Sequence, residues 1–146
     1  MGRLARFFAL PGAKRRLFLR ALGRLALNVC RVRFLPSRPW EKSPSMASPT
    51  VLARMPADMP TVDDIVWATT TAARCVPGAS CLVQAITGWS MLQEAGYPAS
   101  LHVGVAKGEK VPLQAHAWIE SEGRVLIGAS EAKFHTLRYS DGSTWR

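Results

Sequence analysis

The stretch SCLVQAITGWSMLQEAG, residues 80–96, predicts the best-defined helix of the sequence. Ser80 is a favourable N-cap residue, Cys81 opens the first turn, and Gly96 ends the helix just before a Tyr-Pro pair. Between these ends the apolar residues recur at three- and four-residue spacing, which is typical of a helix with a buried side. The predicted core stripe consists of Leu82, Ile86, Trp89, Met91 and Leu92.

After residue 100 the hydrophobic period changes from helical to two, which predicts β-strands. One strand begins near Leu101, and a second covers residues 111–120 after a turn at 107–110. Another turn at 121–123 leads into a third strand at 124–127. The core-facing side of the second strand is predicted to carry Val111, Leu113, Ala115, Ala117 and Ile119. Helices followed by an antiparallel meander make an α+β fold.

Two further helices are predicted upstream. The pattern at 12–35 gives an amphipathic helix that ends at Pro36, and another helix begins near Thr61 with acidic residues in its first turn. Between them, residues 36–60 are rich in Pro, Ser and Ala, which indicates a linker. We therefore divide the chain into a basic amphipathic helical segment at 1–40, a linker at 41–60 and a folded core at 61–146.

Positive charge is concentrated at the N-terminal end of the sequence. Residues 1–40 contain ten of the 19 Lys and Arg residues and no acid, so the rest of the chain contains nine bases and all ten acids and is nearly neutral. The basic segment is therefore one arm and not a basic face of the whole fold. Three interpretations stay open: a packed helix with a solvated cationic side, peripheral contact with an anionic membrane surface, or docking to an acidic partner protein. Nucleic acid is not an expected partner, because the segment lacks interleaved aromatic residues for base stacking.

The composition is that of a globular protein. Hydrophobic residues make up 48% of the chain and charged residues 20%, which excludes a disordered tail or a collagen-like fibre. No apolar run is long enough for a membrane-spanning helix. Three cysteines cannot all pair within the chain, and no C-x-x-C spacing suggests zinc. We expect a reducing, cytoplasmic location and no metal or cofactor.

A candidate for nucleophilic catalysis is Cys81. A free thiol titrates near ~8.5, and both the positive end of a helix and a neighbouring imidazolium favour the thiolate. Cys81 stands at a predicted helix start, and His116 shares one side of the second strand with Trp118 and Glu120. If the helix packs against that open side of the sheet, His116 can reach the sulfur. The alternative is structural, because a lone cysteine often serves as a small buried residue and a strand histidine often makes only a hydrogen bond.

Several blocks of this sequence resemble one known family. They are residues 75–85 (CVPGASCLVQA), 91–96 (MLQEAG), 101–105 (LHVGV), 115–120 (AHAWIE) and 123–128 (GRVLIG). In this order they resemble the lasso-peptide biosynthesis B proteins, and more narrowly the stand-alone leader-peptidase half of those proteins. That half belongs to the transglutaminase-like, papain-related cysteine protease superfamily. The resemblance covers about residues 61–137.

The resemblance implies a transglutaminase-like core in which the nucleophile helix packs on a small antiparallel sheet. It also implies proteolysis: removal of the leader from a ribosomally synthesised precursor before macrolactam closure, with Cys81 as nucleophile and His116 as general acid and base. Many members place an aspartate about twelve residues after the histidine, and here that position is Gly128. That aspartate orients the histidine ring. In this chain the orienting group is then Glu131, which we prefer, or Glu120, or a backbone carbonyl, or there is none.

The resemblance further implies partners. Fused members carry a small winged-helix domain that docks the leader, and this chain shows none, so we expect a separate leader-binding protein that presents the precursor. A macrolactam-forming cyclase is the second expected partner. The alternative function is a non-catalytic scaffold of the same fold that gathers leader-bound precursor and cyclase, and transamidation to an amine acceptor is a third interpretation.

Overall fold

The computed structural model describes residues 8–34, 59–107, 113–130 and 134–140. The elements, in chain order, are α2 (Gly12–Phe34), α3 (Val62–Ala73), α4 (Cys81–Glu94), β1 (Ser100–Ala106), β2 (Gln114–Ser121), β3 (Arg124–Ile127) and β4 (His135–Ser140). The strands form one four-stranded sheet in the order β3-β2-β1-β4, and every neighbouring pair is antiparallel. The α+β prediction is therefore confirmed, with the helix that starts at Cys81 packed on a small antiparallel sheet.

The helix ends follow from local capping residues. Thr61 caps α3, and its side chain and that of Asp64 satisfy each other's backbone N–H groups in a capping box. Ser80 caps α4, and its Oγ accepts from the backbone N–H of Val83 at 3.4 Å. At the other end of α4, the N–H of Tyr97 donates to the carbonyl of Leu92 at 2.9 Å, which closes the last turn. The boundaries predicted for this helix are confirmed.

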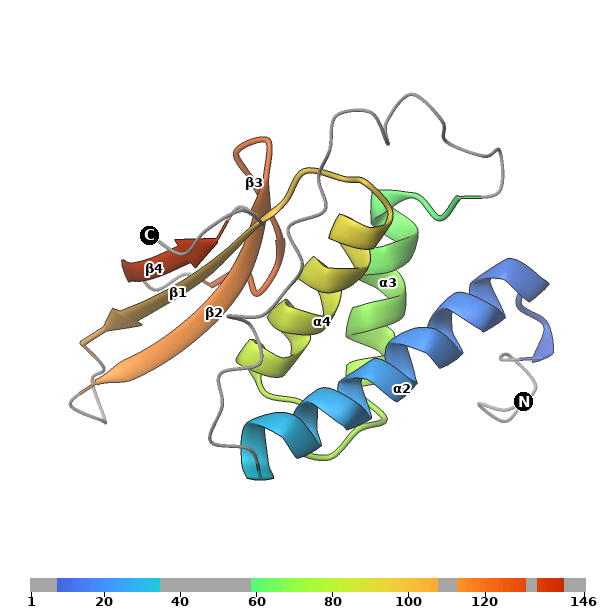
Figure 1. Cartoon of the computed structure of the whole chain (residues 1–146), viewed down its shortest axis with the longest axis horizontal. Helices are drawn as coiled ribbons and strands as arrows, with labels where there is room; N and C mark the ends of the chain where they lie inside the picture. Colours follow the sequence, from blue (N-terminus) through green and yellow to red (C-terminus); the bar gives the residue numbers. More distant parts are fainter. Residues whose placement is uncertain (1–7, 35–58, 108–112, 131–133, 141–146) are drawn as a thin grey trace.

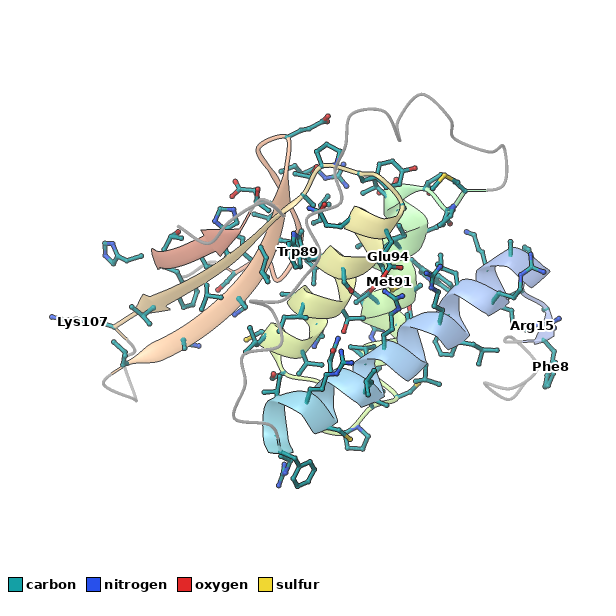
Figure 2. The ribbon with its side chains drawn as sticks, in the orientation of Figure 1. Phe8, Arg15, Trp89, Met91, Glu94 and Lys107 are labelled. Carbon is teal, nitrogen blue, oxygen red and sulfur yellow. The ribbon has the colours of Figure 1, made fainter. Side chains whose placement is uncertain are left out.

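Helix α4 is the centre of the core. Figure 1 shows it between the sheet on one side and α2 and α3 on the other. Trp89 lies between α4 and the strands, and its indole N–H donates to the carbonyl of Ala99 at 3.0 Å (Figure 2). Glu94 projects from the opposite side of α4 and pairs with Arg20 and Arg24 of α2 at 2.7 and 2.6 Å. Because it is covered on both sides, α4 buries far more than the single predicted stripe.

Helix α2 packs on α3 and α4 through one side. Leu17, Ala21 and Leu25 are buried there, and Nδ2 of Asn28 donates to Oγ1 of Thr87 at 2.9 Å in the interior. The opposite side of α2 is exposed. No helix in the described ranges is both long enough and apolar enough to cross a membrane.

Two details of the predicted strands are wrong. The second strand was expected to bury Leu113 and Ala115, but β2 begins at Gln114 and both residues are exposed; Val111 lies outside the described residues. The outer part of the β1–β2 hairpin extends past the core, and for this reason the side chains of β2 are buried only from Ala117 onward. The last strand that the sequence predicts is the one at 124–127, and the structure adds the edge strand β4 beside β1.

The predicted linker at 41–60 lies outside the described residues apart from Met59 and Pro60.

Candidate active site

Cys81 occupies the first turn of α4, where its side chain is half-buried. The first N–H groups of a helix have no acceptor within the helix. Ser80 satisfies the N–H of Val83, and no described residue accepts from the N–H of Cys81. The thiol therefore lies at the positive end of the helix dipole, next to a backbone donor that could bind an oxyanion.

The ring of His116 lies on the face of the sheet that turns away from α4. Its neighbours along β2 show this, because Ala117 and Ile119 are buried in the core and successive side chains of a strand point to opposite faces. A methyl group placed on Gly88 of α4 would lie 2.9 Å from Cδ1 of Ile119, so α4 contacts the Ile119 face directly. On the other face, the His116 ring stacks on Phe134 with centroids 4.9 Å apart.

A backbone carbonyl orients the imidazole. Nε2 of His116 lies 2.6 Å from the carbonyl oxygen of Gly128. A carbonyl oxygen can only accept, so Nε2 carries the proton and Nδ1 is the basic nitrogen of the neutral ring. Gly128 stands where the resemblance leads one to expect an aspartate. The backbone carbonyl, one of the alternatives left open from sequence, is the group that contacts the ring.

The contact requires a glycine at position 128, because of the backbone conformation there. Its φ is +84°, in the left-handed region that favours glycine, and a Cβ at this position would lie 2.6 Å from the carbonyl oxygen of Ala117. An aspartate would carry that Cβ, so this backbone cannot accept the aspartate without moving. The conformation that leaves no room for a Cβ at position 128 also brings the Gly128 carbonyl to the His116 ring.

Aromatic and imidazole rings form a row on this outer face. Trp118 stacks on His102 at 5.3 Å between centroids and on His116 at 6.2 Å, with interplanar angles of 10° and 16°. A hollow of about 110 Å³ adjoins the row and is lined by His116, Trp118, Val125, Gly128, Ala129, Ser130 and Phe134. No sequence pattern marks Phe134 as a lining residue, because it lies just before β4, a strand that was not predicted.

The two glutamates proposed for the third role are placed differently. Oε2 of Glu120 lies 3.2 Å from Nε2 of His102, so the carboxylate contacts a histidine other than His116. Glu131 lies outside the described residues. Cys75 and Cys30 are both exposed, and the described residues contain no group of three or more His, Cys, Asp or Glu side chains that could hold a metal ion.

Burial lowers the pKa of His102 below its usual 6.5, and the Glu120 carboxylate opposes this shift only in part. The unfolded chain therefore binds a proton at this residue more readily than the folded chain. The contribution of His102 to the free energy of unfolding is complete above pH 6.5 and is lost as the pH falls from there through the folded-state pKa.

The variant His102→Gln tests this contribution. When the pH is lowered from about 7.5 to about 5, we expect the free energy of unfolding, measured with urea, to fall less in the variant than in the parent chain. An equal loss in both proteins would show that His102 does not contribute.

The structure does not bring Cys81 and His116 into contact. The expectation from sequence required α4 to pack on the His116 side of the sheet, and α4 packs on the Ala117 side instead. Within the described ranges no hydrogen bond joins the Cys81 sulfur to the His116 ring. The pairing of these two residues therefore remains a prediction.

The chain belongs to the transglutaminase-like superfamily. The sequence model described as Transglutaminase-like superfamily matches residues 25–138, which include the C-terminal part of α2, the other two helices and most of the sheet. The superfamily includes cysteine peptidases. The comparisons with curated proteins and with solved structures find no match.

Proposed function

We propose that this protein is a cysteine peptidase that removes the leader from a ribosomally synthesised lasso-peptide precursor before macrolactam closure. Membership of the transglutaminase-like superfamily supports the class of enzyme. The observation that carries the proposal is the first turn of α4, where a half-buried thiol stands beside a backbone N–H without a described acceptor. The hydrogen bond to the Gly128 carbonyl also fixes the tautomer of His116, which leaves Nδ1 as the basic nitrogen.

The proposed reaction is acyl transfer to water. The Cys81 thiolate attacks the carbonyl carbon at the leader–core junction, and the backbone N–H of Cys81 binds the oxyanion that forms. The protonated His116 then gives its proton to the departing amine, which leaves a thioester on Cys81. Water, deprotonated by His116, attacks the thioester and releases the carboxylic acid and the thiol.

This mechanism requires Cys81 and His116 to come closer than they are in the described conformation. The proposal therefore includes a rearrangement, which takes place when the leader-bound precursor or a partner binds. A separate leader-binding protein would present the precursor, and a macrolactam-forming cyclase would take the product. The chemistry on a newly made precursor and the three free cysteines fit a cytoplasmic location.

A second candidate function is favoured by the same geometry. A scaffold that gathers leader-bound precursor and cyclase needs the transglutaminase-like fold but no contact between thiol and imidazole. The opposite placement of α4 and the His116 ring on the two faces of the sheet is the observation that favours it.

Thiol alkylation distinguishes the two functions. We expect iodoacetamide to modify Cys81 at least about tenfold faster than Cys75 or Cys30 at neutral pH, in the presence of precursor and leader-binding protein. Mass spectrometry of the digested protein gives the three rates in one sample, so the two exposed cysteines are internal references. In the peptidase, His116→Ala lowers the Cys81 rate, because the imidazolium no longer stabilises the thiolate. A Cys81 rate that does not change with His116→Ala supports the scaffold.

A further inference from the structure

The outward side of α2 carries an apolar stripe that nothing in the described chain covers. Leu19, Leu27 and Phe34 are 52%, 50% and 73% exposed. They lie on one side of the helix together with Gly23 and Cys30, because these positions follow one another at three- and four-residue spacing. The buried side of the same helix, with Leu17 and Leu25, already anchors it to the core, so the stripe is not needed for folding.

Basic residues flank this stripe. Helix α2 contains seven Lys and Arg residues and no acid. Arg20 and Arg24 pair with Glu94, and Lys14 pairs with Asp64, on the side toward the core. Further out, Arg15 and Arg33 lie five turns apart on one edge of the stripe and Arg31 lies on the other edge, while Arg16 lies within the stripe, five turns from Phe34. Arg16, Arg31 and Arg33 are exposed and have no acidic partner among the described residues.

The shape of this surface favours a flat partner. Helices α3 and α4 lie behind α2, so its outward side is a ridge 23 residues long (Figure 1). A hollow of about 530 Å³ beside the N-terminal half of α2 lies on the flank toward the start of α3, where Met59, Pro60 and Asp64 line it. Figure 2 shows Arg15 projecting at the N-terminal end of α2, far from the tip of β1 at Lys107. An apolar stripe accompanied by arginines is the pattern of helices that lie in a membrane interface, where leucine and phenylalanine enter the acyl boundary and arginine contacts phosphate.

We propose that the outward side of α2 binds an anionic membrane surface. The arginines supply attraction to the negative headgroups, and Leu19, Leu27 and Phe34 insert at the boundary between headgroups and acyl chains. The protein is thereby held at the surface by α2, and the sheet, which packs on the other side of α4, stays away from the membrane (Figure 1). This inference does not depend on the proposed peptidase activity.

Cosedimentation of the full chain with lipid vesicles tests the proposal. We expect binding to an equimolar mixture of phosphatidylglycerol and phosphatidylcholine, weak binding to phosphatidylcholine alone, and a decrease in binding as salt is added. The double substitution Arg16→Glu with Arg31→Glu should weaken binding at least about tenfold. The matched control is Lys107→Glu with Arg124→Glu, which makes the same change in net charge at two exposed positions away from α2, one just after β1 and one in β3. An equal loss in both doubles would mean that only net charge matters, and it would overturn the proposal.

A second set of variants tests the contribution of the apolar side chains of α2. Leu19→Gln with Leu27→Gln should also weaken binding about tenfold, without loss of the helical circular dichroism signal. A polarity-sensitive fluorophore on Cys30, in a Cys75→Ser and Cys81→Ser background, should shift to the blue and resist an aqueous quencher when anionic vesicles are added. The same fluorophore on Lys107→Cys, with Cys30→Ser added to that background, should not change. Failure of the full chain to bind anionic vesicles, or a Cys30 signal like that at position 107, would overturn the proposal and leave an acidic protein as the partner to test.

Discussion

Replacing Cys81 by alanine is expected to lower the rate of leader removal by at least ~10³-fold and to leave the fold intact. Alanine cannot form the thioester, so only the backbone donor and substrate binding remain to act on the scissile bond. The fold should tolerate the change, since the side chain is small and only half-buried. The measurement is single-turnover cleavage of the precursor, with its leader-binding protein present, followed by mass spectrometry.

Cys75→Ala is the matched control for this experiment. Cys75 is exposed after α3, and its sulfur is 4.0 Å from the carbonyl oxygen of Thr71, so its loss removes a thiol without touching α4. Cleavage at the parental rate is expected for this variant. A Cys81→Ala protein that still cleaves would refute the nucleophile assignment. A parent chain that binds precursor but never cleaves it would leave the scaffold as the function.

The second large effect is expected at Gly128. Gly128→Ala should lower the free energy of unfolding by about 3 kcal/mol or more, because the new Cβ meets a backbone oxygen and cannot be relieved by a side-chain rotation. The backbone must then move, and the Gly128 carbonyl moves with it, away from Nε2 of His116. Urea unfolding measures the loss of stability, and nitrogen NMR of the imidazole reports whether Nε2 still carries the proton.

Gly123→Ala separates the clash from the backbone conformation. Gly123 has a φ of +75°, close to that of Gly128, but a Cβ there would have no heavy atom within 4 Å. This variant therefore bears only the cost of the left-handed conformation, about 1 kcal/mol, and should keep the His116 tautomer. If the two alanine variants lose the same stability, the close approach at Gly128 is not the reason for glycine there.

The local sequence determined the elements and their ends. Ser80 and Gly96 bound α4, and Thr61 bounds α3, because capping depends on side chains within a few residues of the helix end. The alternation at Leu101 and Ala117 determined which residues of the first two strands could face a core. Counting charges identified the basic N-terminal segment, seven of whose ten bases lie on α2. Each of these properties depends on a short stretch of chain.

Only the tertiary structure decided which side of the sheet α4 covers, and this separated Cys81 from His116. Alternation places Ala117 and His116 on opposite faces but does not say which one the nucleophile helix will meet; the packing of Gly88 against Ile119 decided it. The carbonyl of Gly128 as the partner of His116 was likewise one option among several until the backbone was known, because a main-chain oxygen has no signature in the sequence. Burial and contact depend on residues far apart in the chain, and no short pattern contains them.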